Sequence, residues 1–516
     1  MNNELQACHA KALDASCAGQ WDLAREYIEK GLACDARNAD LLHLRGRVDL
    51  ALLRNAEAVH WLELAVEASS DPNIHNSLCV ALTRVGAFGR AADVARAGLD
   101  LLGARASMPE ASLLWFNLGL ALQLQDDLDE ARIAYEASIQ ANPDNSVSYN
   151  NLGITLNRQG HIHSAIDVLR KSIERDASNL EAHSNLGHAL LAVGRYRQAW
   201  PHFEHRWAAS RDKSGAVPGL PPSLPIPAWY GQQTRPAEDR LLVLNEQGLG
   251  DSLQFCRYLP LALDRFAKVS YVCPPSLQRL LRVSLGSRFP GLEILDAPPS
   301  GFEDWNWYVS LMSLPGAFGT TVEDVPAELP YLRADPDDVR KFAARLNAST
   351  TSEWPRIGIA WAGGHHEMPV DRLRSLVPRL MDSVLAWPHA NWVSLQKPDH
   401  ESKRLHPDQR PHIIDWMDDM RDFADTAALI ESLDLVIAAD TSVAHLAGAM
   451  GKPVWLLNRF AGCWRWLHGR EDSPWYPGMR IFTQSRKGDW DDVLARVLAE
   501  LERARMQGTL VSTRRG

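Results

Sequence analysis

Three short segments of the sequence combine glycines with carboxylate and hydroxyl side chains, in patterns that could bind a phosphorylated substrate. The first, residues 247–252, reads Gln-Gly-Leu-Gly-Asp-Ser. Its glycines, Gly248 and Gly250, allow a tight turn and let a ligand approach the backbone, and the Asp251 carboxylate could accept a proton from an attacking hydroxyl group. The same carboxylate could do no more than cap the following helix. Glu246 is then the substitute candidate for the base.

The second segment, residues 439–453, follows a predicted strand and begins a predicted helix. Its candidate ligand-binding residues are Asp440, Thr441, Ser442, Val443 and His445. The backbone N–H groups of Ser442 and Val443, with the helix dipole behind them, would form an anion site suited to a diphosphate. His445 lies one turn along, near the same face as Thr441. The alternative is a capping aspartate followed by a buried core histidine.

The third segment, residues 361–374, contains a glycine pair that begins at Gly363, followed by two arginines. A departing nucleoside diphosphate develops negative charge, which a cation or a metal ion must stabilise. Arg372 and Arg374 are the natural cations, with Lys397 behind them. None of the three segments carries an Asp-x-Asp pair, so we expect a metal-independent site.

Cofactor chemistry is not indicated by these segments. The first is not a G-x-G-x-x-G dinucleotide fingerprint, which disfavours hydride transfer. His365 and His366 are adjacent but lack a partner three or four residues away, so they are a weak metal signal. We therefore expect neither a cofactor nor a bound metal.

The elements that must position these segments are short apolar runs alternating with amphipathic helices, which is typical of parallel sheets. Predicted strands cover residues 241–244, 268–272, 292–295, 356–361, 391–395, 435–439 and 453–457. Each of the three segments directly follows a strand, where ligands of such sheets bind. The pattern predicts two Rossmann-like lobes, residues 239–350 and 351–516, with a cleft between them.

The first two fifths of the chain are repetitive. An Asn-Leu-Gly run ends at Gly119, Gly153 and Gly187, and this spacing of 34 residues is the tetratricopeptide period. An alanine stands twelve residues after each small-residue position, because two helices of a hairpin approach closely only where facing side chains are small. We predict about six helical hairpins in an all-α solenoid over residues 1–207, then a proline-rich linker over residues 208–238.

Three asparagines, Asn117, Asn151 and Asn185, occupy one repeat position on the first helix of successive hairpins. An amide offers donors and an acceptor, so each could pair with one peptide unit of an extended chain in the concave groove. The alternative is that these asparagines only support the turns between helices.

Nearly the whole chain resembles known glycosyltransferases. The repeats resemble the superhelix of the O-linked N-acetylglucosamine transferases, whose asparagine ladder holds protein substrates. The loop that ends at Asp251 and the Asp-Thr-x-x-x-His-Leu-Ala motif from Asp440 resemble the heptosyltransferase-like family, glycosyltransferase family 9. This resemblance implies a GT-B fold, Asp251 as the base of an inverting transfer, and donor contacts from Asp440, Thr441, Ser442 and His445. Residues 365–370 depart from the family pattern.

The amino-acid composition limits the classes of molecule that the protein is expected to bind. Lys plus Arg is 54 and Asp plus Glu is 64, a net charge of −10 that argues against nucleic acid as the main partner. No apolar run reaches the roughly 18 residues of a membrane span, and the first residues do not read as a signal peptide. We therefore expect a cytoplasmic protein without a transmembrane segment.

These observations together favour a glycosyltransferase that moves a sugar from a nucleotide sugar to a Ser or Thr hydroxyl group of a protein client. The client would be recruited by the groove of the repeats. Two alternatives stay open: a catalytically inactive scaffold that binds protein partners, and a heptosyltransferase-like enzyme that acts on lipid or polysaccharide acceptors.

Overall fold

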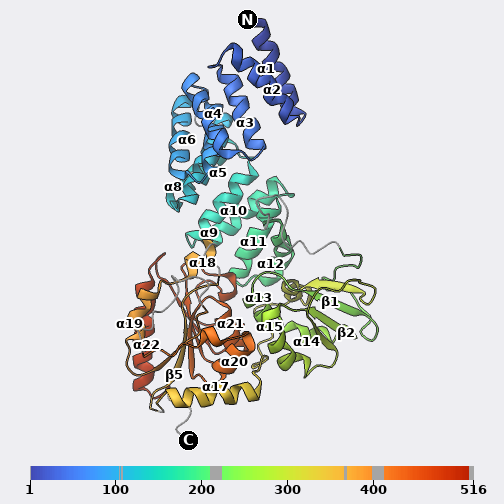
Figure 1. Cartoon of the computed structure of the whole chain (residues 1–516), viewed down its shortest axis with the longest axis vertical. Helices are drawn as coiled ribbons and strands as arrows, with labels where there is room; N and C mark the ends of the chain where they lie inside the picture. The colour runs from blue at the N-terminus through green and yellow to red at the C-terminus, as the bar shows by residue number, and fades with distance from the viewer. Residues whose placement is uncertain are drawn as a thin grey trace. The chain divides into compact units, whose positions relative to one another are not determined.

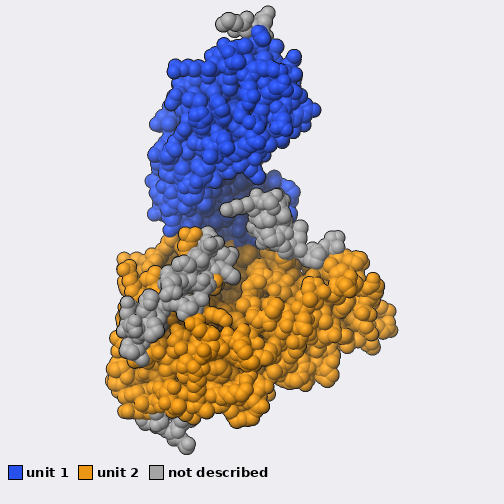
Figure 2. Space-filling model, in the orientation of Figure 1, with its two compact units in different colours: residues 1–186 blue, residues 187–516 orange. Residues whose placement is uncertain are grey.

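The computed structural model describes residues 2–103, 105, 108–209, 224–351, 353–364, 369–397 and 412–510. The chain forms two compact units, Met1–Leu186 and Gly187–Gly516, which Figure 2 colours blue and orange. The boundary between these units falls inside helix α11 (Leu180–Ala192). The extent of the repeats, residues 1–207, stays a prediction.

The first unit is all-helical, and its helices follow one another as short hairpins (Figure 1). They are α1 (Asn2–Cys17), α2 (Trp21–Cys34), α3 (Ala39–Ala51), α4 (Asn55–Ala68), α5 (Pro72–Arg84), α6 (Phe88–Leu102), α7 (Ser112–Leu124), α8 (Leu128–Ala141), α9 (Ser146–Arg158), α10 (Ile162–Arg175) and the first part of α11. Several begin at a side-chain cap, such as Asn38, which accepts the N–H of Leu41 at 3.1 Å.

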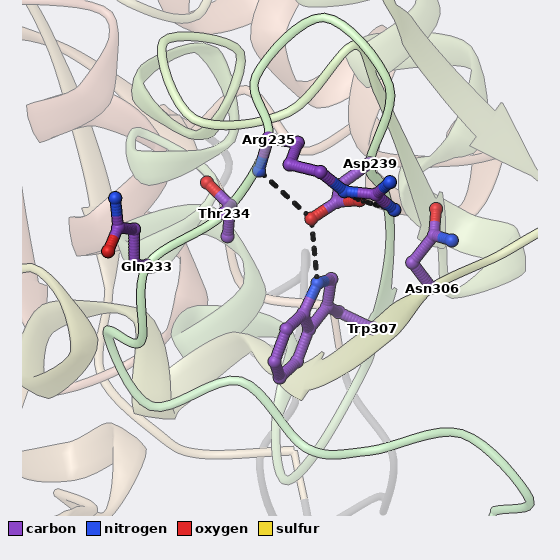
Figure 3. Close-up of a pocket in the computed structure, with 6 residues that line it drawn as sticks. All are labelled: Gln233, Thr234, Arg235, Asp239, Asn306 and Trp307. Atoms are coloured by element: carbon purple, nitrogen blue, oxygen red, sulfur yellow. Dashed lines mark hydrogen bonds and ion pairs between the residues drawn. The ribbon is translucent and has the colours of Figure 1, made fainter.

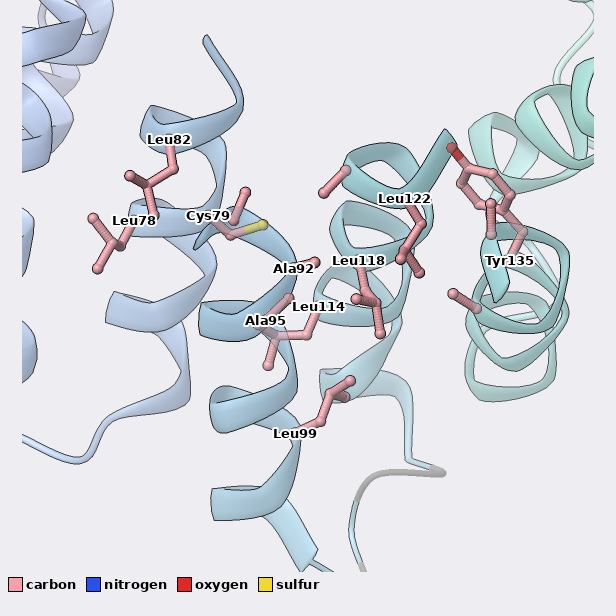
Figure 4. Packing of buried hydrophobic residues seen from close by; sticks show 14 of the residues in the cluster. Leu78, Cys79, Leu82, Ala92, Ala95, Leu99, Leu114, Leu118, Leu122 and Tyr135 are labelled. Atoms are coloured by element: carbon pink, nitrogen blue, oxygen red, sulfur yellow. The ribbon is translucent and has the colours of Figure 1, made fainter. Parts of the chain in front are cut away.

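Small residues let these helices approach each other, as the sequence predicted. A Cβ atom on Gly153 would lie 2.5 Å from Cγ of Leu169, and one on Gly119 would lie 2.8 Å from the ring of Tyr135. Leucines and alanines of successive helices fill the space between hairpins, and Figure 4 shows Leu114, Leu118 and Leu122 of one helix in this core. The expectation of an all-α repeat region is confirmed.

A polar contact recurs with the repeat. Asn145 donates a hydrogen bond from Nδ2 to Oγ of Ser112 at 3.2 Å, and Asn179 donates in the same way to Oγ of Ser146 at 2.9 Å. Each asparagine also accepts the N–H of the first turn of the following helix, at 3.3 Å and 3.1 Å. The asparagine before a hairpin therefore joins that hairpin to the preceding one.

The second unit contains two parallel sheets, so the expected α/β class is confirmed for this part of the chain. The first sheet has the order β3-β2-β1-β4 and the second has the order β6-β5-β7-β8-β9. The strands are β1 (Arg240–Leu244), β2 (Lys268–Val272), β3 (Leu292–Leu295), β4 (Trp307–Ser310), β5 (Arg356–Ala360), β6 (Asn391–Ser394), β7 (Leu435–Ala439), β8 (Val454–Asn458) and β9 (Met479–Thr483).

Helices lie in each connection between successive strands except that from β3 to β4, as is usual for parallel pairing. The α-helices are α13 (Leu249–Phe255), α14 (Tyr258–Ala262), α15 (Pro275–Leu281), α16 (Leu314–Ala317), α17 (Pro336–Ser349), α18 (Pro369–Arg374), α19 (Asp382–Leu385), α20 (Phe423–Glu431), α21 (Ser442–Ala449) and α22 (Trp490–Met506). No helix among the described residues is long and apolar enough to cross a membrane.

The strand order defines where a ligand would bind in each sheet. In the first sheet β1 lies between β2 and β4, and in the second β5 lies between β6 and β7. At such a position the connections leave the sheet in opposite directions and open a crevice beyond the carboxyl ends of the strands. In the second sheet the strand order reverses between the neighbouring strands β5 and β7. The three segments of interest follow β1, β5 and β7, so each follows a strand beside such a position.

The second unit also includes helix α12 (Tyr196–Phe203), which the sequence assigned to the last hairpin. Trp200 of α12 donates a hydrogen bond from Nε1 to the carbonyl oxygen of Thr320 at 2.7 Å. Its ring lies 6.2 Å from that of Trp464, and the ring of Tyr196 lies 6.2 Å from that of Trp475. These contacts hold α12 against Thr320, which follows β4 of the first sheet, and against Trp464 and Trp475, which follow β8 of the second sheet.

Candidate functional site

Asp251 lies in the first turn of α13, where both oxygens of its carboxylate have partners. Oδ2 accepts the N–H of Gly248 at 2.9 Å, which caps the helix. Oδ1 forms an ion pair with Arg465, a residue far along the sequence. The capping interpretation is therefore correct as a description of the contact, and the role as a base stays a prediction.

The second segment forms the beginning of α21, as predicted. Thr441 precedes the helix and Asp440 precedes Thr441, and both are buried. The Thr441 Oγ1 atom is buried and has no hydrogen-bond partner among the described residues. The first N–H groups of a helix have no partner within it, so Ser442 and Val443 present donors at this end, whereas the N–H of Ala444 donates to the Thr441 carbonyl oxygen at 3.1 Å.

His445 is held on two sides. Its Nδ1 atom lies 2.9 Å from the hydroxyl group of Tyr476, and its ring stacks on that of Trp466 with centroids 5.0 Å apart. Burial, together with the positive charges of Arg465, Arg257 and Arg374, lowers the pKa of His445 well below its usual value. The imidazole is therefore neutral near pH 7 and can act as a hydrogen-bonding group only.

The first and second segments meet. A Cβ atom on Gly250 would lie 2.9 Å from Cδ2 of His445 and 3.6 Å from Cα of Ser442. A glycine is needed here because the α13 backbone approaches α21 this closely. The beginnings of two helices, one from each sheet, are thus brought together beside the Asp251 carboxylate.

Arg465 completes this junction, and the sequence reasoning missed it. It lies in the 3-10 helix η9 (Trp464–Trp466), between two tryptophans. Burial disfavours its charge, but the Asp251 and Asp440 carboxylates outweigh this and raise the pKa of Arg465 further. An arginine between two aromatic residues matches no known motif, so the sequence alone does not indicate that Arg465 belongs to the site.

The third segment is positioned by hydrogen bonds to its backbone. Gln396 Oε1 accepts the N–H groups of Trp361 and Ala362 at 3.0 Å and 2.8 Å. The N–H of Gly363 donates to Oγ of Ser375 at 3.0 Å, and a Cβ atom on Gly363 would lie 2.7 Å from the carboxylate of Asp371. Gly363 therefore serves close packing here.

The expected cations of the third segment differ in their surroundings. Arg374 forms an ion pair with the buried Asp371 and contributes to the positive potential at His445. Arg372 is exposed on α18, and Lys397 donates a hydrogen bond to the Met420 carbonyl oxygen at 3.2 Å. His365 and His366 lie outside the described residues.

Glu246, the substitute candidate for the base, is part of a buried network. Its carboxylate accepts hydrogen bonds from Arg206 at 2.6 Å and 3.1 Å and from the N–H of Met312 at 3.0 Å. Burial raises the pKa of Glu246, although Arg206 opposes this. These contacts give Glu246 a structural role between β1 and the 3-10 helix η3 (Glu204–Ala209).

The asparagines of the expected peptide ladder contact neighbouring repeats. Asn117 is buried and donates from Nδ2 to Oδ1 of Asn76 at 2.7 Å, and Asn185 donates to Oδ1 of Asn150 at 2.9 Å. Asn151 is half-buried. Two of the three amides thus bridge consecutive hairpins, and their use in peptide binding stays a prediction.

A surface pocket lies elsewhere, at the amino ends of β1 and β4 (Figure 3). It is lined by Gln233, Thr234, Arg235, Asp239, Asn306 and Trp307. Asp239 accepts hydrogen bonds from Arg235 at 2.8 Å and from Nε1 of Trp307 at 3.1 Å, so its charge is compensated. This pocket is at the end of the sheet opposite to the three segments and does not extend their site.

Comparison with known proteins identifies the repeats. The tetratricopeptide repeat family matches residues 110–178, so this part of the chain consists of tetratricopeptide repeats, which indicate interaction with other proteins. Protein FlbA of Caulobacter vibrioides is 28% identical over 333 residues, which cover 60% of this chain and 53% of FlbA. The chain therefore spans about half the length of this curated relative.

Solved structures similar to the chain include tetratricopeptide proteins. The MamA protein is 19% identical, with a TM-score of 0.31, over 34% of this chain and 94% of its own. PilF of Pseudomonas aeruginosa is 18% identical, with a TM-score of 0.36, over 42% of this chain and 95% of its own. YrrB, described as a TPR protein with an unusual peptide-binding site, is 20% identical, with a TM-score of 0.29, over 33% of this chain and 86% of its own.

Proposed function

We propose that the protein is a glycosyltransferase of GT-B architecture that transfers a sugar from a nucleotide sugar to a Ser or Thr hydroxyl group of a protein. The observation that carries this proposal is the junction of α13 and α21, where Gly250 contacts His445 and Asp251 lies beside a helix N-terminus. A carboxylate and an anion-binding helix end, from two parallel sheets, are the groups that sugar transfer from a diphosphate requires.

In this mechanism Asp251 is the general base. The acceptor hydroxyl group gives its proton to the Asp251 carboxylate as its oxygen forms a bond to the anomeric carbon. The bond from that carbon to the phosphate oxygen breaks, and its electron pair leaves with the nucleoside diphosphate. The attack is in line with the leaving group, so the configuration at the anomeric carbon inverts.

The donor diphosphate is assigned to the beginning of α21. The N–H groups of Ser442 and Val443 and the Thr441 hydroxyl group can donate to phosphate oxygens. Arg465 and Arg374 supply positive charge near His445, which stabilises the charge that develops on the leaving group. On this assignment the transfer proceeds without a metal ion or cofactor.

The tetratricopeptide repeats recruit the protein acceptor. Their presence is the reason to prefer a protein over a lipid or polysaccharide as the sugar acceptor, since such repeats bind other proteins through extended surfaces. The reaction is placed in the cytoplasm as part of the same proposal.

A second candidate function, a scaffold that binds proteins without turnover, is favoured by one observation. Both oxygens of the Asp251 carboxylate already have partners, Gly248 and Arg465. A carboxylate whose two oxygens are both engaged has no oxygen free to accept a hydrogen bond from an acceptor hydroxyl group. The two candidates differ in a single measurable property, which is sugar transfer.

The test uses the purified full-length protein with client proteins that co-purify with it, identified by mass spectrometry. Incubation with a panel of nucleotide sugars should add the mass of one sugar to a client. Asp251→Asn should abolish this while nucleotide binding persists, and Asp264→Asn, an exposed aspartate of the same sheet region, is the matched control. Binding of no nucleotide sugar in calorimetry would refute the proposal, and binding without transfer would favour the scaffold.

A further inference from the structure

The Arg465 guanidinium is buried with fewer acceptors than it has N–H groups. Nη2 pairs with Asp251, and Nη1 donates to the Cys463 sulfur at 2.9 Å, which is a weak acceptor. Nε is buried and has no hydrogen-bond partner among the residues that the structure describes. A guanidinium presents five donors in a planar fork that suits phosphate oxygens.

Two further buried donors without partners come from the adjacent segments. They are the Thr441 hydroxyl group, just before α21, and Nε1 of Trp466, the residue that follows Arg465. Thr441 is 7% exposed and Trp466 is fully buried. Buried donors without an acceptor are rare in folded proteins and call for an explanation. Three of them beside the N-terminus of α21 indicate a site for an anion rich in oxygens.

The two tryptophans on either side of Arg465 in the chain are packed against other aromatic rings. The Trp464 ring lies 5.7 Å from that of Phe203 and stacks on that of Phe255 at 6.2 Å. The Trp466 ring stacks on His445. Both neighbours of Arg465 in the chain are thus packed against other rings. The Arg465 side chain itself lies between the Asp251 carboxylate on α13 and the beginning of α21.

We infer that Arg465 is a substrate-operated switch: it holds the Asp251 carboxylate until a diphosphate binds at the beginning of α21, and then exchanges that carboxylate for phosphate oxygens. The inference rests on the proposed function and gives it an order of events. The donor binds first and releases the base, and the acceptor follows.

The exchange has a physical reason in each direction. Without a diphosphate, the carboxylate compensates a buried guanidinium that would otherwise be very costly to desolvate. A diphosphate carries more charge and more acceptor oxygens than one carboxylate, so it binds the guanidinium more strongly. The carboxylate oxygen that Arg465 releases can then accept a hydrogen bond from the acceptor hydroxyl group, as a general base must.

The switch is tested by titrating the full-length protein with inorganic pyrophosphate, without divalent metal, in a calorimeter. Arg465→Gln should weaken pyrophosphate binding about tenfold or more, because a charge-assisted contact is lost. Arg465→Lys should weaken it less. Asp251→Asn should tighten binding several-fold, because the carboxylate no longer competes for the guanidinium. Arg470→Gln, in the same stretch of chain but paired with Asp472 at the surface, is the matched control and should change nothing.

The double variant separates competition from a general charge effect. If Asp251 acts by holding Arg465, Asp251→Asn should no longer tighten binding once Arg465→Gln is present. Tightening that persists in that background would refute the switch, as would unchanged binding in Asp251→Asn alone or no pyrophosphate binding by both wild type and Asp251→Asn. Circular dichroism checks the fold of each variant, and Arg465→Lys and Asp251→Asn keep the test decisive if Arg465→Gln does not fold.

The outcome is independent of the test for sugar transfer. Coupled pyrophosphate binding with no sugar transfer from any donor would refute the proposed function and keep the exchange of partners at Arg465. Sugar transfer by a protein whose pyrophosphate affinity is the same in Asp251→Asn as in wild type would keep the proposed function and refute the switch.

Discussion

Oε1 of Glu246 lies 2.6 Å from Nη2 of Arg206, and Oε2 of the same carboxylate lies 3.1 Å from Nε of that guanidinium. Both side chains are buried. Arg206 lies in η3, directly after α12, and Glu246 follows β1. This bidentate ion pair therefore joins the segment before the linker to the first sheet.

Removing one partner of this pair should destabilise the second unit strongly. We expect Arg206→Met to lower the free energy of unfolding by about 3–5 kcal/mol, because it leaves a buried carboxylate without its cation. Urea denaturation followed by tryptophan fluorescence measures this, since all tryptophans except Trp21, Trp61 and Trp115 lie in the second unit.

The control for this prediction is a pair at the surface. Arg340→Gln removes an arginine that pairs with Asp337, with side chains that are 72% and 70% exposed, and should cost less than about 1 kcal/mol. The double variant Arg206→Met with Glu246→Gln should recover part of the loss. Equal stability of Arg206→Met and wild type would show that the pair contributes nothing to folding.

The contact between α13 and α21 makes a second prediction. Gly250→Ala should destabilise the protein by about 1–3 kcal/mol, because the new Cβ atom would lie 2.9 Å from the ring of His445. That ring cannot move easily, since it is held by Tyr476 and Trp466. Thermal unfolding and pyrophosphate titration of the variant measure the effect on the fold and on the junction.

Gly248→Ala is the matched control for this substitution. A Cβ atom on Gly248 would meet only the Asp251 carboxylate, at 3.4 Å, which is an ordinary contact. The substitution also keeps the N–H that Asp251 accepts. The two variants should therefore differ clearly, and equal melting temperatures would contradict the close approach of the two helices.

Local patterns in the sequence were enough to predict the position of the segments, because apolar runs and glycines depend on neighbours in the chain. The strand predicted at residues 241–244 is observed as Arg240–Leu244, and that at 435–439 as Leu435–Ala439. Since ligand sites follow strands in parallel sheets, the Asp251 and Asp440 segments could each be placed at the carboxyl end of a strand before any contact was known.

Partners far apart in the sequence could not be predicted in this way. Nothing in the residues around Asp251 indicates an ion pair with Arg465, and nothing around Asn117 indicates that its amide contacts Asn76 in another hairpin. Both contacts depend on how elements pack. The same is true of Glu246. From the sequence it would be expected to be a free carboxylate beside a loop, but in the structure it forms an ion pair with Arg206.

The neutral state of His445 makes a prediction about pH. Below pH 6.5 the unfolded chain binds a proton at this residue, whereas the folded protein does not, because burial and neighbouring arginines lower its pKa. The unfolded state then binds more protons, so stability must fall as the pH decreases from 6.5. The contribution is at most about 1.4 kcal/mol per pH unit.

Replacing the imidazole by a neutral amide should remove this contribution. His445→Asn should show a smaller loss of unfolding free energy than wild type between pH 6.5 and pH 5.5, measured by urea denaturation at each pH. This interval lies above the range in which most carboxylates titrate. His163→Asn, at an exposed position of the repeats, should keep the wild-type slope. A His445→Asn slope equal to that of wild type would show that the folded protein protonates His445 normally.

The asparagines of the repeats should separate into structural and binding roles. Asn117→Ala should lower stability by about 1–3 kcal/mol, because it leaves the Oδ1 of Asn76 without the donor that it accepts at 2.7 Å. Asn151 is half-buried, so Asn151→Ala should have a smaller effect on stability and reduce the amount of client protein that co-purifies. Gln140→Ala, an exposed amide on α8, is the control for both readouts. Quantitative mass spectrometry of the bound client, normalised to folded protein, measures capture. Client capture that is unchanged in Asn151→Ala would remove this residue from the groove, and the asparagine ladder would then be a set of contacts between hairpins.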